Sequence, residues 1–401
     1  MLVNEKTWNY IRQHADDDVR KLALQGVKDA EVDLQMALQQ IAGRQTARRK
    51  LPSWAAVDGI IYPPHLNMEQ CSSEQTARYK GKIAGEGESM VDLTGGFGVD
   101  FYWISQGFRQ RTYVEQNEQL CTISSHNFEV LGLACSVCCY DTATYLTTMP
   151  HVDLIYMDPA RRNEHGGRTY GIADCSPNVL ELLPLLLEKA DRLLVKLSPM
   201  LDWRKAVEDL KYVTEVHIVS VDNECKELLL LLDKERKEDL RVVCVNNDSH
   251  FEFFPTERNG LSLVEKRPFA GRETAFLYEP NASIMKAGCF EALEARYPVS
   301  QVAPNSHLFL SDVEIGDFPG RKFQILAISS MNKQDIKCKF EEIINQKLTS
   351  MKSANITVRN FPMSVDQLRK KLKLKDGGDT YIFATTTASG EHKLLICRKI
   401  G

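Results

Sequence analysis

VDLTGGFGVD, residues 91–100, is the stretch that decides how the rest of this 401-residue chain is interpreted. An apolar strand ends at Asp92, and a glycine turn leads from it into a helix. Gly96 and Gly98 have no side chain, so the backbone turns tightly there and comes close to a bound ligand. The following helix offers amide donors at its N-terminus. The turn is not GxGxxG, and no Lys-Ser/Thr follows, which excludes a phosphate-binding P-loop. Taken alone, it is as often structural as functional.

From about residue 88, short apolar runs alternate with amphipathic stretches, which is typical of βα units on a mostly parallel sheet. The runs LIYM (154–157) and LLLLL (228–232) are continuous in apolar residues, as expected of strands covered on both faces. The predicted strands are 89–93, 111–115, 135–140, 152–157, 191–197, 213–221 and 225–232. The predicted helices are 98–106, 117–131, 142–147, 177–189 and 202–210.

Different patterns flank this α/β region. Residues 7–50 have apolar positions at three- and four-residue steps and are predicted to be helical until Pro52. After two strand-like pieces, Asn281 opens a predicted helix over 281–296, and the end of the chain alternates strands with helices. The predicted parts are a helical region (1–80), an α/β domain (81–275), a short segment (276–320) and an α+β domain (321–401).

Two acidic residues follow the second and third predicted strands. Glu115 lies at a strand end about 20 residues after the glycine turn, where a carboxylate accepts both hydroxyls of a ribose. A solvent-facing charge is the plainer alternative, and the glycine turn favours the functional one. Asp141 can accept a hydrogen bond from an adenine amino group, or it can cap the helix that begins at Thr142. The two roles of Asp141 are compatible.

A third acidic motif is IYMDPARR, residues 155–162. Pro159 fixes the backbone as it leaves the fourth strand, which holds Asp158 at the carboxyl edge opposite the glycine turn. Arg161 and Arg162 follow at once, and guanidinium groups pair with phosphate or carboxylate. The alternative is an ordinary turn with two solvated arginines. Lys196, at the end of the fifth strand, is a further candidate for holding a phosphate of the substrate.

The order of these motifs over residues 88–232 resembles the class I S-adenosylmethionine-dependent methyltransferases. The resemblance implies a Rossmann-like seven-stranded sheet, with S-adenosyl-L-methionine bound by Asp92, Thr94, Gly96, Gly98, Glu115 and Asp141. Two positions depart from the usual pattern. Thr94 replaces the first glycine, and Ala160-Arg161 replaces the aromatic residue that stacks on the target base in amino methyltransferases.

Further segments resemble one bacterial methyltransferase family: QCSSEQTARYK (70–80), KLSPMLD (196–202) and NECKELLLL (223–231). Members of this family carry a small ferredoxin-like segment and a C-terminal THUMP-like domain, which implies these identities for residues 276–320 and 321–401. THUMP domains in other enzymes bind RNA, so tRNA or rRNA is the implied partner. Residues 70–80 either contact the methionine end of the cofactor or form a cap helix before the sheet.

The chemistry of methyl transfer assigns roles at the Asp-Pro motif. An amine nucleophile needs an acceptor for its proton, which Asp158 supplies together with the Pro159 carbonyl region. Arg161, Arg162 and Lys196 would hold the substrate. A covalent route through cysteine is disfavoured, because no Cys adjoins the motif. The polar stretch 163–176 is a candidate substrate loop.

The charge distribution and the cysteine content indicate the kind of partner and the cellular compartment. The net charge is −4, which excludes a uniformly basic protein, but residues 331–401 hold 14 Lys+Arg against 7 Asp+Glu. That asymmetry favours a polyanionic partner, although the pentad Arg369–Lys373 alone is better explained as a solvated helix face. The 11 cysteines and the absence of an apolar leader indicate a reducing cytoplasm. No apolar run approaches the ~20 residues of a membrane helix.

The pair Cys135/Cys138 has no partner pair, so no metal site is expected, and these thiols with Cys139 are predicted to be core residues on a short strand. Three functions remain. The leading one is N-methylation of an RNA base. The others are a methyltransferase acting on protein or a small molecule, and a cofactor-binding, RNA-binding protein without catalysis.

Overall fold

The computed structural model describes residues 3–161, 171–235, 239–255, 275–346 and 352–401. The chain divides into two compact units: Met1–Val216 with Leu228–Glu238, and His217–Glu227 with Asp239–Gly401. The hairpin of β8 (Val213–Val221) and β9 (Glu224–Asp233) contributes residues to both units.

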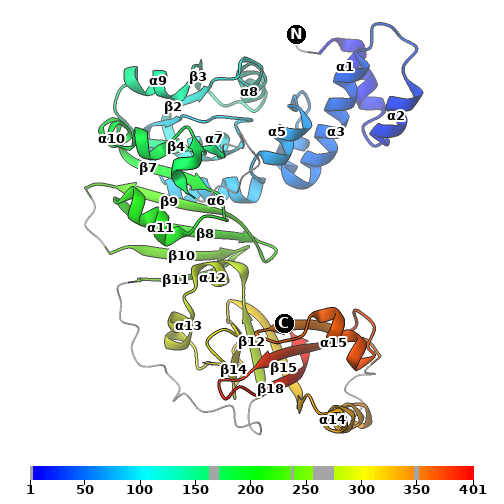
Figure 1. The fold of residues 1–401 in the computed structure, drawn as a ribbon. Coiled ribbons are helices and arrows are strands. Elements are labelled where there is room, and N and C mark those ends of the chain that lie inside the picture. The colour runs from blue at the N-terminus through cyan, green and yellow to red at the C-terminus, as the bar shows by residue number, and fades with distance from the viewer. Residues whose placement is uncertain (1–2, 162–170, 236–238, 256–274, 347–351) are drawn as a thin grey trace. The chain divides into compact units, whose positions relative to one another are not determined.

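Six helices precede the sheet among the described residues of the first unit (Figure 1). Asn4, Asp18 and Asp33 each accept a hydrogen bond from the first turn of a helix, so the predicted helical stretch 7–50 consists of three separately capped helices. The first two of these helices pack against the third. The helices are α1 (Glu5–Gln13), α2 (Val19–Gln25), α3 (Leu34–Lys50), α4 (Pro52–Ala55), α5 (His65–Gln70) and α6 (Glu74–Ala84).

The α/β sheet has the strand order β11-β10-β8-β9-β7-β4-β1-β2-β3. Parallel pairing joins β1, β2, β3, β4 and β7, and β9 runs antiparallel to β7. The strand order reverses between β1 and β4, which is where open α/β sheets bind ligands beyond the carboxyl ends of their strands. The bounds are β1 (Gly87–Asp92), β2 (Phe108–Glu115), β3 (Ser136–Cys139), β4 (Val152–Met157), β7 (Ala190–Leu197), β10 (Arg241–Asn246) and β11 (Ser249–Phe253).

The α/β fold class predicted from the sequence is confirmed. The sheet has nine strands rather than the expected seven, because β10 and β11 continue it beyond β8. A two-stranded ribbon, β5 (Ala160–Arg161) with β6 (Cys175–Ser176), follows β4. The helices of this part are α7 (Val99–Ile104), η1 (Ser105–Gly107), α8 (Glu118–Val130), α9 (Thr142–Thr148), η2 (Ile172–Asp174), α10 (Val179–Lys189) and α11 (Trp203–Leu210).

The short strand β3 corrects one expectation. Cys138 and Cys139 lie on it as predicted, but Cys139 is exposed, and Cys135 and Cys138 are only half-buried. The reason is the position of β3 at the edge of the sheet. The residues of a strand do not show its place in the sheet, so the sequence alone does not predict that one side of this strand meets solvent.

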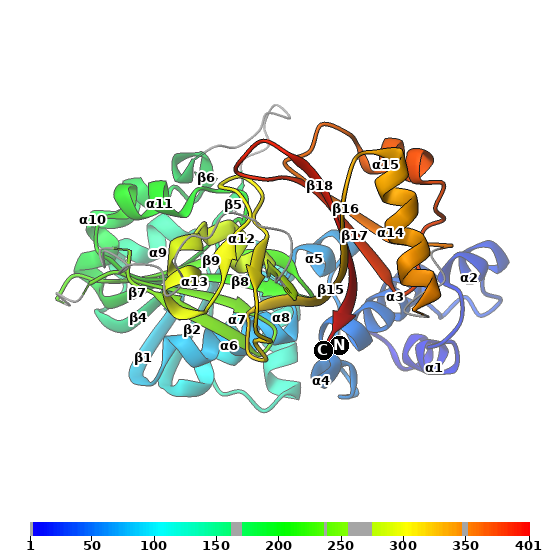
Figure 2. The same cartoon turned by 90° about the horizontal axis from the view of Figure 1, so that it is seen from below.

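The second unit contains a sheet of order β13-β14-β12-β15-β18-β17-β16. Helices α14 and α15 lie together on one side of β15–β18 (Figure 2), and their apolar residues share a core with those strands. On the other face, Phe323, Phe383 and Leu395 pack with residues of the preceding segment. The bounds are β12 (Phe276–Pro280), β13 (Ser300–Gln301), β14 (Phe309–Ser311), β15 (Gly320–Ser330), α14 (Lys333–Asn345), β16 (Asn355–Arg359), α15 (Val365–Leu372), β17 (Thr380–Thr386) and β18 (His392–Ile400).

The single helix expected over 281–296 is wrong. Asn281 caps a helix as predicted, but Gly288 takes a left-handed conformation with φ +66° and ends it. Two helices result, α12 (Ala282–Ala287) and α13 (Phe290–Arg296).

Candidate active site

The glycine turn between β1 and α7 is held by the neighbouring strand β2. The Gly96 N–H donates to Glu115 Oε2 at 2.8 Å, and Tyr113 Oη donates to the Gly96 carbonyl oxygen at 2.5 Å. Gly96 and Gly98 have φ +56° and +80°, a region that disfavours side chains. A Cβ on Gly95 would lie 2.2 Å from the Tyr113 ring. Gly95 is therefore as constrained as the two glycines that the sequence pattern singled out.

Glu115 lies at the end of β2, beside this turn. Its second carboxylate oxygen, Oε1, accepts from the Asn117 N–H at 2.8 Å. Two backbone amides thus fix the carboxylate, one from each side. A Cβ on Gly96 would meet only the Thr94 carbonyl oxygen, at 3.8 Å. The turn is therefore open at Gly96, beside the Glu115 carboxylate.

Asp141 follows β3 and caps α9. Its Oδ1 accepts from the Thr144 N–H at 3.0 Å, and the hydrogen bonds from Thr144 lower the pKa of this exposed carboxyl. Thr142, at the start of the same helix, donates from Oγ1 to the Leu93 carbonyl oxygen at 2.7 Å. The cap role expected of Asp141 is present, and the link to Leu93 ties α9 to the end of β1.

Asp92 and Thr94 connect the first strand to the Asp-Pro motif. Asp92 Oδ1 accepts from the Thr94 N–H at 2.9 Å, and the Asp158 N–H donates to Thr94 Oγ1 at 2.6 Å. The Thr94 hydroxyl therefore joins the end of β1 to the residue that follows β4. This gives a physical reason for a threonine at the position where related turns have glycine.

Burial raises the pKa of Asp92 well above its usual range, and the nearby carboxylates of Asp100, Asp158 and Glu115 add to the shift. Asp92 is only 1% exposed. The proton is therefore held on this carboxyl to a much higher pH than on an exposed aspartate.

Asp158 forms an ion pair with Lys196, whose Nζ lies 2.5 Å from Asp158 Oδ2. Lys196 Nζ is also 3.9 Å from Asp100 Oδ2. That Lys196 holds a phosphate of the substrate stays a prediction, and the structure shows that its ammonium group pairs with Asp158, the predicted proton acceptor. Pro159 is buried beside Asp158. Arg162 lies outside the described residues, and Arg161 pairs through its backbone with Cys175.

Sequence reasoning missed Asp100 and the residues bound to it. Asp100 Oδ2 accepts from Tyr156 Oη at 2.7 Å and from Ser72 Oγ at 2.8 Å, and Asp100 Oδ1 lies 3.1 Å from Lys80 Nζ. Lys80 is fully buried. The one available signal was the position of Asp100 inside the quoted motif. Its partners are separated from it by 20 to 96 positions in the sequence, so no spacing reveals them.

Residues 70–80 form the end of α5, a short connection and most of α6, with Ser73 capping α6. The cap-helix interpretation of this segment is therefore the one that the geometry supports. Its polar side chains Ser72 and Lys80 bind Asp100. The segment reaches the catalytic edge through this carboxylate.

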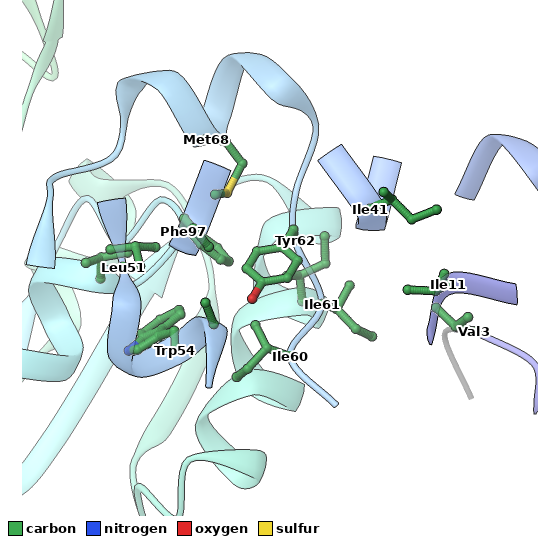
Figure 3. Close-up of a cluster of buried hydrophobic side chains, with 14 of the residues drawn as sticks. Val3, Ile11, Ile41, Leu51, Trp54, Ile60, Ile61, Tyr62, Met68 and Phe97 are labelled. Carbon is green, nitrogen blue, oxygen red and sulfur yellow. The ribbon is translucent and has the colours of Figure 1, made fainter. Parts of the chain in front are cut away.

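The tip of the glycine turn enters an apolar core formed with the N-terminal helices. Phe97 is 4% exposed, and its ring lies 5.2 Å from Trp54 and 6.4 Å from Tyr62. Figure 3 shows Phe97 among Leu51, Trp54 and Tyr62. The N-terminal helices thus hold the turn through Phe97, in addition to the hydrogen bond between Gly96 and Glu115.

The described residues contain no group of three or more His, Cys, Asp and Glu side chains that could hold a metal ion. Among the same residues, no helix combines the length and apolar character needed to cross a membrane.

Comparisons with known proteins identify the C-terminal part and the whole chain. Residues 276–319 match a ferredoxin-like domain family, and residues 320–399 match a THUMP domain-like family. A solved structure described as "putative methyltransferase from Porphyromonas gingivalis W83" is 30% identical, with 100% of both chains covered and a TM-score of 0.85. No curated protein matches the sequence.

Two more distant structures each match part of the chain. TrmK from M. capricolum, solved with S-adenosylhomocysteine, is 10% identical over 40% of this chain and 68% of its own, with a TM-score of 0.32. An rRNA methylase from Streptococcus thermophilus is 15% identical over 40% of this chain and 94% of its own, with a TM-score of 0.30. Both TM-scores are too low for either match to support a functional argument.

Proposed function

Because the chain belongs to the bacterial methyltransferase family of the Porphyromonas gingivalis protein, with its C-terminal THUMP-like domain, we propose that it transfers a methyl group from S-adenosylmethionine to a nitrogen atom of RNA. One observation carries the proposal. The glycine turn and Glu115 meet at the point where the strand order reverses, and Asp158 is bound to the same turn through Thr94.

The binding of the donor follows from this geometry. Glu115 accepts from the ribose hydroxyls, Asp141 from the adenine amino group, and Gly96 lets the donor approach the backbone. The region around the turn holds the carboxylates of Asp100, Asp158 and Glu115 against the ammonium groups of Lys80 and Lys196, while the buried Asp92 keeps its proton. That balance suits a cationic ligand. The donor supplies an electrophilic methyl group on a positively charged sulfur.

Asp158 has the chemistry to receive the proton that N-methylation releases. As the new N–C bond forms and the C–S bond breaks, an N–H proton of the nucleophile passes to Asp158 Oδ1, and solvent then removes it. Pro159 keeps the backbone rigid at this point, and alignment of nucleophile and methyl group supplies much of the rate. A covalent cysteine route finds little support, because burial raises the pKa of the nearby Cys71 thiol to about 11.

An exposed cluster of lysines supports an RNA substrate. In this basic cluster, the Lys375 N–H donates to the Lys352 carbonyl oxygen at 3.1 Å, which places the two residues side by side next to the end of α15. The cluster lies within the THUMP-like match. It consists of Lys352, Lys370, Lys371, Lys373 and Lys375, all exposed. Phosphates of a nucleic-acid backbone are the complementary partner.

Calorimetry with S-adenosylmethionine and S-adenosylhomocysteine tests donor binding. A folded wild-type protein that binds neither ligand refutes the proposal. Transfer of a radiolabelled methyl group to RNA from a strain that lacks this gene then tests the substrate. Asp158→Ala should keep the affinity for S-adenosylhomocysteine and lose turnover, and turnover that survives removes Asp158 from the mechanism.

Filter binding of tRNA and rRNA fragments at two salt concentrations tests the basic cluster. The double variant Lys373→Glu/Lys375→Glu should weaken RNA binding and lower the salt dependence by about one unit of slope per lost phosphate contact. Lys333→Glu/Lys337→Glu on α14 is the matched control and should bind as wild type does. Methyl transfer to protein or to a small molecule, with none to RNA, supports the alternative substrates instead.

A further inference from the structure

We propose that Asp100 is a positioning residue for methyl transfer, and that helix α6 of the N-terminal region is thereby part of the active site. Asp100 holds Lys196, and Lys196 holds the carboxylate of Asp158. This inference rests on the proposed function, because Asp158 is its proton acceptor.

Four contacts fix Asp100 in place. Tyr156 of β4 and Ser72 donate hydrogen bonds to Oδ2, at 2.7 and 2.8 Å, and Lys80 pairs with Oδ1 at 3.1 Å. The fourth contact is Lys196 Nζ, 3.9 Å from Oδ2. Lys80 and Lys196 with these hydrogen bonds outweigh the effect of burial, so that the pKa of Asp100 is lowered and the residue stays ionised.

Burial makes this arrangement rigid. The Lys80 side chain is 0% exposed and that of Asp100 11%. A buried ammonium group requires a paired and hydrogen-bonded partner, so Lys80 and Asp100 determine each other's position. Lys80 Nζ also donates to Ser72 Oγ at 3.1 Å, which closes the network on the α6 side.

Asp158 needs such support. Its side chain is 37% exposed, whereas that of Lys196 is 14% exposed. An exposed carboxylate alone samples several rotamers, and the ammonium group of Lys196 restricts it by a contact of 2.5 Å. Lys196 is in turn held between two carboxylates, Asp158 and Asp100. The direction of the Asp158 side chain therefore depends on Lys196 and, through it, on Asp100.

The arrangement also specifies the nucleophile. Lys196 binds Asp158 through Oδ2, and among the described residues no hydrogen bond or ion pair reaches Oδ1. The available oxygen accepts one hydrogen bond from the substrate. Lys196 balances the charge of Asp158, so the pair favours a neutral N–H donor, such as an exocyclic amine or a ring amide, over an anionic oxygen.

The test removes the buried pair without leaving a single charge behind. Asp100→Asn alone would remove the carboxylate that pairs with the buried Lys80 ammonium group. The main variant is therefore Lys80→Met/Asp100→Asn. We expect it to fold, to bind S-adenosylhomocysteine within about threefold of wild type, and to lose about 100-fold in kcat on RNA with little change in KM, because Asp158 is displaced and binding is not. Arg78→Met, on the same helix and half exposed, is the matched control and should keep wild-type kcat.

Two Lys196 variants test whether the charge of this side chain or only its size is needed. Lys196→Gln should lose kcat, and Lys196→Arg should recover most of it, because the guanidinium group restores the ion pair. Equal kcat in wild type and in Lys80→Met/Asp100→Asn would overturn the inference, as would a loss confined to KM.

A second readout needs no turnover. Reductive methylation with formaldehyde, followed by mass spectrometry of the peptide, measures how fast Lys196 reacts. Lys196 should react several-fold faster in Lys80→Met/Asp100→Asn than in wild type, since the second carboxylate no longer holds it. If wild type transfers no methyl group but this rate difference is present, the proposed function fails and the positioning role of Asp100 stands. Equal rates overturn the positioning role.

Discussion

Replacing Phe97 with alanine should weaken both the stability of the first unit and its affinity for the donor. Phe97 lies at the tip of the glycine turn and is 4% exposed. Its ring meets Trp54 edge to face, with 5.2 Å between the ring centroids. The same turn donates the Gly96 N–H to Glu115. Removing the ring therefore releases the turn from the core of the N-terminal helices (Figure 3).

The size of the effect follows from burial. A buried Phe→Ala substitution costs about 3–5 kcal/mol, and an aromatic pair contributes roughly 0.5–1.5 kcal/mol beyond the area that it buries. We expect a loss of about 4 kcal/mol in the free energy of unfolding. Since the turn must also be ordered again before the donor binds, the Kd for S-adenosylhomocysteine should rise roughly tenfold, which corresponds to about 1.4 kcal/mol.

Urea unfolding monitored by tryptophan fluorescence measures this loss in the first unit alone. All four tryptophans lie within Met1–Val216, namely Trp8, Trp54, Trp103 and Trp203. Leu186→Ala is the control. Leu186 is fully buried in α10, away from the turn, so it should cost about 2–5 kcal/mol and leave the Kd unchanged in the folded protein. If Phe97→Ala unfolds like wild type, or keeps the wild-type Kd, the core does not support the turn.

Three further substitutions probe the strand ends. Burial raises the pKa of Asp92, so the folded protein holds this proton more tightly than the unfolded chain. The resulting stabilisation is complete below the ordinary carboxyl pKa of about 4 and is lost as the pH rises through the folded value. Urea midpoints at several pH values should show a weaker decline with rising pH in Asp92→Asn. Thr94→Val leaves the Asp158 N–H without its acceptor and should cost about 1–2 kcal/mol in urea unfolding, whereas an unchanged midpoint would make this hydrogen bond dispensable. Glu115→Gln should weaken S-adenosylhomocysteine binding by about 1–3 kcal/mol in calorimetry, and wild-type affinity would remove Glu115 from the donor site.

The sequence identified the strands where apolar runs end at clear boundaries. β4 and β8 have the bounds predicted for them, 152–157 and 213–221, because their residues are almost all apolar or buried and polar or turn residues flank them. It did not identify the edge position of β3, which depends on the order of strands in the sheet rather than on the residues of the strand.

The same limit applies to the site. Glu115 and Asp158 are each marked by a local motif, and the structure brings both to the glycine turn through Gly96 and Thr94. Asp100 lies inside the motif VDLTGGFGVD, but no local pattern shows which residues it binds. Its role depends on Lys80 and Tyr156, residues of a helix and a strand that approach each other only after folding. Local patterns in the sequence thus predict which residues bind a ligand. They do not predict which other residues hold those residues in place.

Two chemically independent contacts connect the N-terminal helices to the proposed donor site and to the proposed proton acceptor. One is apolar, Phe97 in the core with Trp54, and it fixes the turn under the donor. The other is ionic, Lys80 with Asp100, and it fixes the carboxylate that orients Lys196. Breaking the first contact exposes aromatic surface, and breaking the second removes an ion pair from Lys80, whose side chain is fully buried. The predicted boundary between the helical region (1–80) and the α/β domain (81–275) falls inside helix α6, which spans Glu74–Ala84 without a break. We therefore expect the N-terminal helices to be required for the proposed activity.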